Sequence, residues 1–146
     1  MLNYEEIREY VCRSRLINAN DNFSRKIYIR AERLIKEENI KCFYLKNLFV
    51  EDKVLEIDLF CNDGRIVKVG LQDNNFIVTE VYDAKNIVKV TLKENHKYEY
   101  EKELFIQFNT GEVLSLNSKN DTNEHYVNEF SKIIEDIIGN YIYKIK

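Results

Sequence analysis

Two carboxylates, Glu56 and Asp58, stand two positions apart in a segment of alternating polarity, and Asp63 follows in the adjoining turn. Three carboxylates brought together could hold a divalent metal ion in a nuclease-like site. In an antiparallel strand with one buried face, however, polar side chains two positions apart are typical of the solvent face. We therefore expect Glu56 and Asp58 to face solvent, and we assign no metal ligands.

The other residues that could do chemistry are three cysteines and two histidines, namely Cys12, Cys42, Cys61, His96 and His125. Three widely separated cysteines do not indicate a disulfide framework, and no C-x-x-C pair or zinc-ligand spacing is present. A nucleophile–base pair of Cys61 with His96 would need the two to meet in space, which no motif indicates. The chain also lacks a glycine-rich phosphate loop and the hydrolase and metalloprotease motifs. We assign no catalytic residue and no cofactor, and we expect a protein that is not an enzyme.

Positive charge is concentrated near the N-terminus. Residues 1–46 hold ten Lys or Arg and seven Asp or Glu, which gives a net charge of +3. Residues 47–146 hold twelve Lys or Arg and eighteen Asp or Glu, which gives a net charge of −6. On a helix, Lys26, Arg30 and Arg33 would share one face and could contact the phosphates of nucleic acid or an anionic membrane surface. The alternative is a solvated helix face whose basic side chains pair with neighbouring glutamates. The interleaved acids and a sequence pI of about 5.5 favour this second interpretation.

Aromatic side chains supply candidate contacts for a partner. Tyr98 and Tyr100 stand among charged residues in the segment 94–103, which is typical of a recognition surface on an exposed loop or hairpin. Tyr126 and Phe130 belong to an apolar stripe near the C-terminus and could flank a groove beside it, although most of that stripe is expected to be core. We interpret these four residues as candidate contacts for a protein or peptide.

Periodicity predicts the elements that must position these residues. Helical spacing indicates helices over residues 3–16 and about 24–38. A longer amphipathic helix is expected to begin after its N-cap Asp121 and to end near Gly139. Short apolar segments between them predict seven strands with short connections, and Asp83-Ala84-Lys85-Asn86 is expected to close one hairpin. The strands are expected at 43–50, 54–61, 66–71, 76–82, 87–92, 104–108 and 113–116.

This order of elements predicts an α+β fold. We expect N-terminal helices, a seven-stranded antiparallel curved sheet or barrel, and a C-terminal amphipathic helix lying against it. A chain of 146 residues has the typical length of one domain, so we treat 1–146 as a single domain. Within it, 1–40 form a helical extension and 41–146 form the barrel and its helix.

The closing portion, from Glu103-Leu-Phe-Ile-Gln-Phe through Asn109-Thr-Gly to Phe130-Ser-Lys-Ile-Ile, resembles bacterial pleckstrin-homology-like domains. In those domains a last hairpin of this kind feeds a helix that plugs one open end of the barrel. The resemblance covers roughly residues 43–138. The whole chain also resembles small uncharacterised proteins of Gram-positive bacteria and their phages.

Members of the pleckstrin-homology-like group that bind phosphoinositides use basic residues around the loop between the first two strands. Here that loop is Glu51-Asp52-Lys53, which is net negative and would repel a phosphorylated headgroup. Phosphoinositide binding is therefore disfavoured.

These observations predict a non-enzymatic interaction module that binds a protein or peptide in the cytoplasm. No apolar run approaches the roughly 20 residues that a transmembrane helix needs, and the acidic N-terminus is unlike a secretory signal. A peptide could add to an exposed strand edge in a groove beside the last helix, and self-association would use the same edge. The alternative is nucleic-acid or anionic-ligand binding through Lys26, Arg30 and Arg33, which is disfavoured but left open.

Overall fold

The computed structural model describes residues 19–145, apart from positions 49, 51, 52 and 74. The helix expected over residues 3–16 lies outside the described residues. The strands are β1 (Ile40–Lys46), β2 (Glu56–Cys61), β3 (Arg65–Gln72), β4 (Phe76–Asp83), β5 (Ile87–Glu94), β6 (Lys102–Phe108) and β7 (Val113–Asn117). The helices are α2 (Ala19–Leu34), α3 (Val127–Asp136), a π-helical segment (Ile137–Ile142) and α4 (Tyr143–Ile145).

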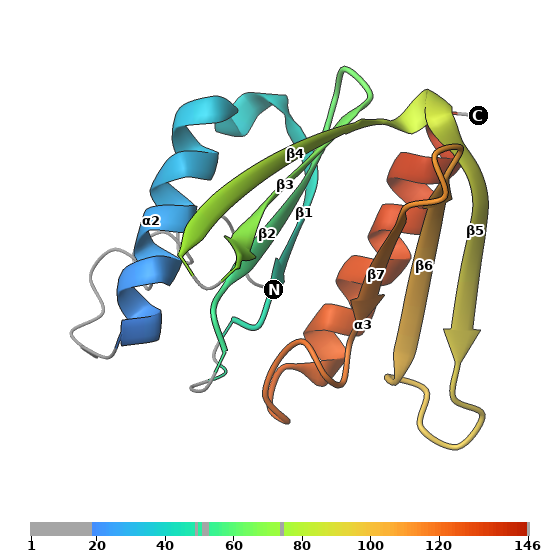
Figure 1. The fold of residues 1–146 in the computed structure, drawn as a ribbon. Helices are drawn as coiled ribbons and strands as arrows, with labels where there is room; N and C mark the ends of the chain where they lie inside the picture. The colour runs from blue at the N-terminus through green and yellow to red at the C-terminus, as the bar shows by residue number, and fades with distance from the viewer. Residues whose placement is uncertain (1–18, 49, 51–52, 74, 146) are drawn as a thin grey trace.

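The strands form two antiparallel sheets (Figure 1). One is a four-stranded sheet in the order β1-β2-β3-β4, and the other is a three-stranded sheet in the order β5-β6-β7. The prediction of one seven-stranded curved sheet or barrel is therefore wrong, because β4 and β5 do not pair and the described strands close no barrel. Of the two expected N-terminal helices only the second falls on described residues, and its bounds differ: α2 runs from Ala19 to Leu34 rather than from about 24 to 38, and the described part of the chain is mostly β.

The segment between β4 and β5 explains why the sheet divides. Residues 83–86 were expected to close a hairpin, but Ala84–Asn86 form a single 3-10 turn instead. The Asp83 carboxylate accepts a hydrogen bond from the Lys85 amide at 2.9 Å, which caps this turn. The Ala84 amide donates to the Gly64 carbonyl at 2.8 Å and the Asn109 amide to the Asn86 carbonyl at 2.8 Å. The turn is thus tied to both sheets and redirects the chain from one to the other.

The helices lie on different faces of the four-stranded sheet. α2 packs against β2, β3 and β4 from outside, whereas α3 contacts β1 and β6 and so lies between the two sheets (Figure 1). The rings of Tyr44 in β1 and Phe130 in α3 meet edge to face with centroids 5.2 Å apart. Tyr82 in β4 stacks on Phe108 in β6 at 4.6 Å, which joins the sheets directly. No helix in the described part of the chain is long and apolar enough to cross a membrane.

Strand β2 is covered on both faces, and this overturns one expectation. Five of its six residues are buried, because α2 covers one face and the space between the sheets the other. Asp58 has no exposed surface and Glu56 is half-buried, so the prediction that both carboxylates face solvent is wrong. Alternating polarity indicates a solvent face only where nothing packs on that face, and here the second sheet and α3 do so.

Candidate functional site

The outer edge of the three-stranded sheet is open. Strand β5 pairs with β6 on one side, and in the described part of the chain no strand pairs with its other side. Figure 1 shows β5 at the margin of the molecule with no element beyond it. The backbone amides and carbonyls on that side of β5 are therefore available to hydrogen-bond another extended chain.

The two faces of β5 differ in chemistry. Val90 and Leu92 stand opposite Ile106 and Leu104, which are buried, yet Val90 is only half-buried and Leu92 is exposed. Lys89 and Lys93 alternate with them on the opposite face and are exposed. Neither lysine has an ion-pair partner among the residues that the structure describes. The open edge thus combines partly uncovered aliphatic side chains on one face with unpaired positive charge on the other.

The loop that follows β5 carries two of the predicted partner contacts. Tyr98 and Tyr100 are 62% and 44% exposed. The side-chain oxygen of Asn95 accepts hydrogen bonds from the Lys97 and Tyr98 amides, and the Asn95 amide donates to the Glu101 carbonyl at 3.0 Å. These bonds restrain the loop, and restraint before binding lowers the entropic cost of binding through its tyrosines.

The other two predicted contacts lie on or beside α3, and their positions differ. Phe130 is 1% exposed and packs on Tyr44, so its side chain belongs to the core. Tyr126 is half-buried and packs against the same core. Of the four aromatic residues, the structure leaves Tyr98 and Tyr100 on the surface.

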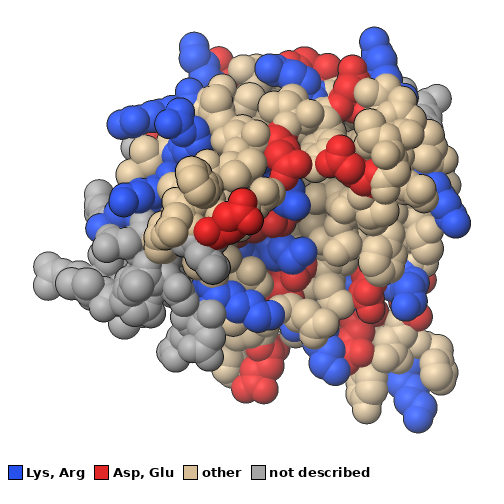
Figure 2. Space-filling model, in the orientation of Figure 1, with Lys and Arg blue, Asp and Glu red and all other residues tan. Residues whose placement is uncertain are grey.

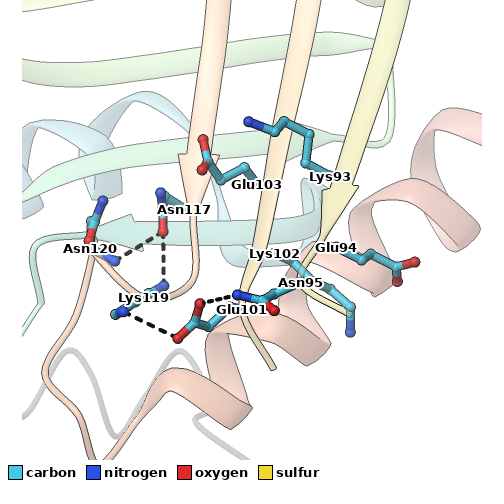
Figure 3. A pocket seen from close by; sticks show the side chains of 9 residues that line it. All are labelled: Lys93, Glu94, Asn95, Glu101, Lys102, Glu103, Asn117, Lys119 and Asn120. Atoms are coloured by element: carbon cyan, nitrogen blue, oxygen red, sulfur yellow. Dashed lines mark hydrogen bonds and ion pairs between the residues drawn. The ribbon is translucent and has the colours of Figure 1, made fainter. Parts of the chain in front are cut away.

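A polar cavity of about 380 Å³ lies where β5 ends (Figure 3). The volume is within the range of sites that bind small ligands. Nine polar residues line it, from the end of β5, the start of β6 and the turn after β7: Lys93, Glu94, Asn95, Glu101, Lys102, Glu103, Asn117, Lys119 and Asn120. Sequence reasoning missed this cavity, because only the pairing of the three strands brings these segments together.

One wall of the cavity is held by internal contacts. The Glu101 carboxylate contacts the Lys119 ammonium at 3.2 Å and accepts a hydrogen bond from the Asn95 side chain at 2.9 Å. The side-chain oxygen of Asn117 accepts from the Lys119 and Asn120 amides at 3.0 and 3.1 Å. These interactions connect the loop after β5 with the turn after β7 and fix this wall of the cavity.

The three basic residues predicted for anion binding do share a face. Lys26, Arg30 and Arg33 are all exposed on α2, and within the described residues none of them has an ion pair. Figure 2 shows Lys and Arg side chains gathered on the side of the molecule where α2 lies. Two exposed apolar residues, Ile29 and Leu34, stand beside them on the helix. The expected pairing with neighbouring glutamates is not seen for these three cations.

A buried polar network links the end of β1 to the turn after β7. The Tyr44 hydroxyl donates to an Asp121 carboxylate oxygen at 2.7 Å, and the same oxygen accepts from the Asn117 amide at 2.6 Å. The Lys46 ammonium donates to the Ser115 carbonyl at 3.1 Å. Asp58 lies next to Tyr44 in the strand register, but neither of its oxygens has a hydrogen-bond partner. Burial first, and then the Glu56 charge, raise the pKa of Asp58 well above its usual value.

The remaining chemical candidates are not brought together. Cys61 is buried in β2, where burial and then the Asp63 charge raise the pKa of its thiol, whereas His96 is exposed on the loop after β5. A raised pKa keeps the thiol protonated and poorly nucleophilic. Asp63 pairs with Arg65 at 2.6 Å and Glu56 with Lys68 at 3.6 Å. The described residues contain no group of three or more His, Cys, Asp or Glu that could hold a metal ion.

Fold and surface together define a mostly β protein with two antiparallel sheets, in which the open side of β5 leads to a polar cavity where that strand ends. The chain belongs to the family described as "Protein of unknown function (DUF3908)", whose model matches residues 3–132. Comparisons with curated proteins and with solved structures give no match. The resemblance to pleckstrin-homology-like domains is not confirmed by these comparisons.

Proposed function

We propose that this chain is a non-enzymatic interaction module in which β5 accepts an extended peptide from a partner protein as an additional strand. The observation that carries the proposal is the open side of β5, whose backbone groups have no partner strand in the described structure. Main-chain hydrogen bonds to such an edge provide affinity, and alternate side chains provide specificity.

The side chains of β5 indicate what the partner strand looks like. Cross-strand neighbours on one face interact directly, so a strand beside β5 places every second side chain next to Lys89 and Lys93. Acidic side chains fit those positions. The intervening side chains would lie beside Val90 and Leu92 and are best apolar. The proposed partner is therefore an extended segment in which acidic and aliphatic residues alternate.

Charge also favours a foreign peptide over a second copy of this chain as the strand that pairs with β5. If two β5 strands paired antiparallel with Thr91 at the centre, Lys89 of one copy would lie opposite Lys93 of the other. Like charges directly opposite each other destabilise a strand pair, and edge lysines are a common protection against self-pairing. The edge therefore favours an acidic partner over self-association.

The test is an NMR titration with N-acetylated heptapeptides that alternate valine with glutamate or valine with lysine. We expect the glutamate peptide to shift the β5 amides saturably and the lysine peptide to bind at least about tenfold more weakly. The double variant Lys89→Glu/Lys93→Glu should reverse this preference. The matched control, Lys97→Glu, changes an exposed lysine on the following loop and should not. Equal binding of both peptides, or no shifts in β5, would overturn the proposal.

A second candidate function rests on α2. Lys26, Arg30 and Arg33 form an exposed, unpaired basic face with Ile29 and Leu34 beside it. Such a face fits an anionic polymer or surface, and its binding should weaken steeply with salt.

For this second candidate, binding to single-stranded DNA and to anionic vesicles is measured over a salt series. Arg30→Glu is compared with Lys41→Glu, which reverses an exposed charge on β1. Loss of binding in Arg30→Glu alone supports the basic face. Equal loss in both variants would show only a general charge effect.

A further inference from the structure

The polar cavity at the end of β5 contains charged groups that its own contacts leave unmatched. Glu101 and Lys119 neutralise each other at 3.2 Å. The Lys102 ammonium turns to α3, where it contacts Glu135 at 3.1 Å and Ser131 at 2.8 Å. Of the six charged residues that line the cavity, three therefore have ion-pair partners.

The three that remain are Lys93, Glu94 and Glu103, none of which has an ion pair with a described residue. Glu94 alternates with Lys93 along β5 and pairs with Lys102 in the strand register, so its side chain lies on the α3 face of the sheet, whereas Lys93 and Glu103 leave one unpaired group of each sign on the other face. One unpaired ammonium beside one unpaired carboxylate fits a ligand that presents a cationic group next to a hydrogen-bond acceptor.

The strand register fixes how these groups are arranged. Lys93 in β5 stands opposite Glu103 in β6, and Glu103 stands opposite Asn117 in β7. The three side chains therefore form one row on one face of the sheet. The Asn117 oxygen is occupied by two backbone amides, so its NH₂ group is turned away from them, toward the Glu103 carboxylate (Figure 3). The row consists of a carboxylate between two hydrogen-bond donors.

We propose that this cavity binds an α-ammonium group together with its neighbouring carbonyl, as presented by the N-terminus of a peptide or by a free amino acid. The ammonium group would lie against the Glu103 carboxylate. The carbonyl oxygen would accept hydrogen bonds from Lys93 or Asn117. Both halves of this ligand find a complementary group already in place, and the Glu101–Lys119 pair holds the wall beside them.

This inference does not rest on strand addition at β5. An N-acetylated peptide can add to the edge but has no ammonium group for the cavity. The two proposals can therefore fail separately.

The test is an NMR titration with three probes: trialanine, N-acetyl-trialanine and free alanine. We expect trialanine to shift the amides of Lys93, Glu103 and Asn117 saturably, with a dissociation constant on the order of 1 mM. Acetylation, which removes the positive charge, should weaken binding at least about tenfold. If free alanine binds as well as trialanine, the ligand is an amino acid; if it binds much more weakly, the ligand is a peptide N-terminus.

Variants provide a second measurement. Glu103→Gln keeps the shape of the side chain and should weaken trialanine binding at least about tenfold. The matched control is Glu99→Gln, an exposed acid on the neighbouring loop that does not line the cavity, and it should bind normally. Equal binding of the acetylated and free peptides, full binding by Glu103→Gln, or no saturable shifts up to about 50 mM would overturn the proposal.

Discussion

At the residue scale, the buried carboxyl of Asp58 is the most unusual group in the described structure. It stands between Tyr44 and Lys68 in the register of β1, β2 and β3. Its oxygens have no hydrogen-bond partner. Burial is the main cause that raises the pKa of this carboxyl well above its usual value, and the negative charge of Glu56 is the second cause. The positive charges of Lys68 and Lys46 lower the pKa of Asp58, but more weakly. The folded protein therefore holds the proton on Asp58 more tightly than the unfolded chain does.

The sign of the pH dependence follows from that difference. Stability associated with protonated Asp58 is fully present below the unfolded pKa of about 3.9 and is lost as pH rises through the higher folded pKa. Asp58→Asn removes the ionisable group while keeping its shape. We expect the variant to match the parent near about pH 4 and to be more stable by about 1–3 kcal/mol at about pH 9.

Urea unfolding at several pH values measures this directly. The control is Glu38→Gln, which neutralises an exposed acid and should leave the pH profile nearly unchanged. A variant that matches the parent at low pH but is less stable than the parent at high pH would show instead that the ionised Asp58 carboxylate makes a favourable interaction.

At the element scale, the short turn between β4 and β5 decides the architecture. Asp83 caps this turn through the Lys85 amide, and backbone hydrogen bonds tie the turn to Gly64 and Asn109. Asp83→Ala should therefore reduce the free energy of unfolding by about 1 kcal/mol, whereas Asp83→Asn, which still accepts the hydrogen bond, should retain most of it. Equal losses in the two variants would indicate that the charge of Asp83, and not its capping, is what stabilises the turn. Chemical denaturation of the three proteins makes the comparison.

At the scale of the whole molecule, the two sheets share contacts that should make them unfold together. Tyr82 stacks on Phe108 across the sheets, and its hydroxyl lies 3.1 Å from carboxylate oxygens of both Glu80 and Glu112. Tyr82→Ala removes this contact and should lower the free energy of unfolding by about 2–4 kcal/mol. The control is Tyr143→Ala, at an exposed tyrosine, which should cost little.

Amide hydrogen exchange checks whether the chain behaves as one domain, as its length predicts. If it does, protection in β2 and in β6 falls by the same amount in Tyr82→Ala. A loss of protection confined to the three-stranded sheet would show instead that each sheet is stable separately.

Local sequence patterns were sufficient to place the individual strands. All seven expected strands are present within a few residues, because side-chain alternation and turn residues act over short distances. The exposed tyrosines and the basic face of α2 were also visible in the sequence, since helical spacing alone puts Lys26, Arg30 and Arg33 together. Each of these features depends on residues that are near one another along the chain.

Contacts between distant segments were decided only by the tertiary structure. Four residues that look like a hairpin turn instead lead from one sheet to the other, because their hydrogen bonds go to Gly64 and Asn109. Asp58 is buried because the second sheet and α3 cover a strand face that looks polar in isolation. The row of Lys93, Glu103 and Asn117 likewise depends on the register of three strands. Local periodicity carries no information about which elements pack together, and that packing determines both burial and the grouping of side chains into a site.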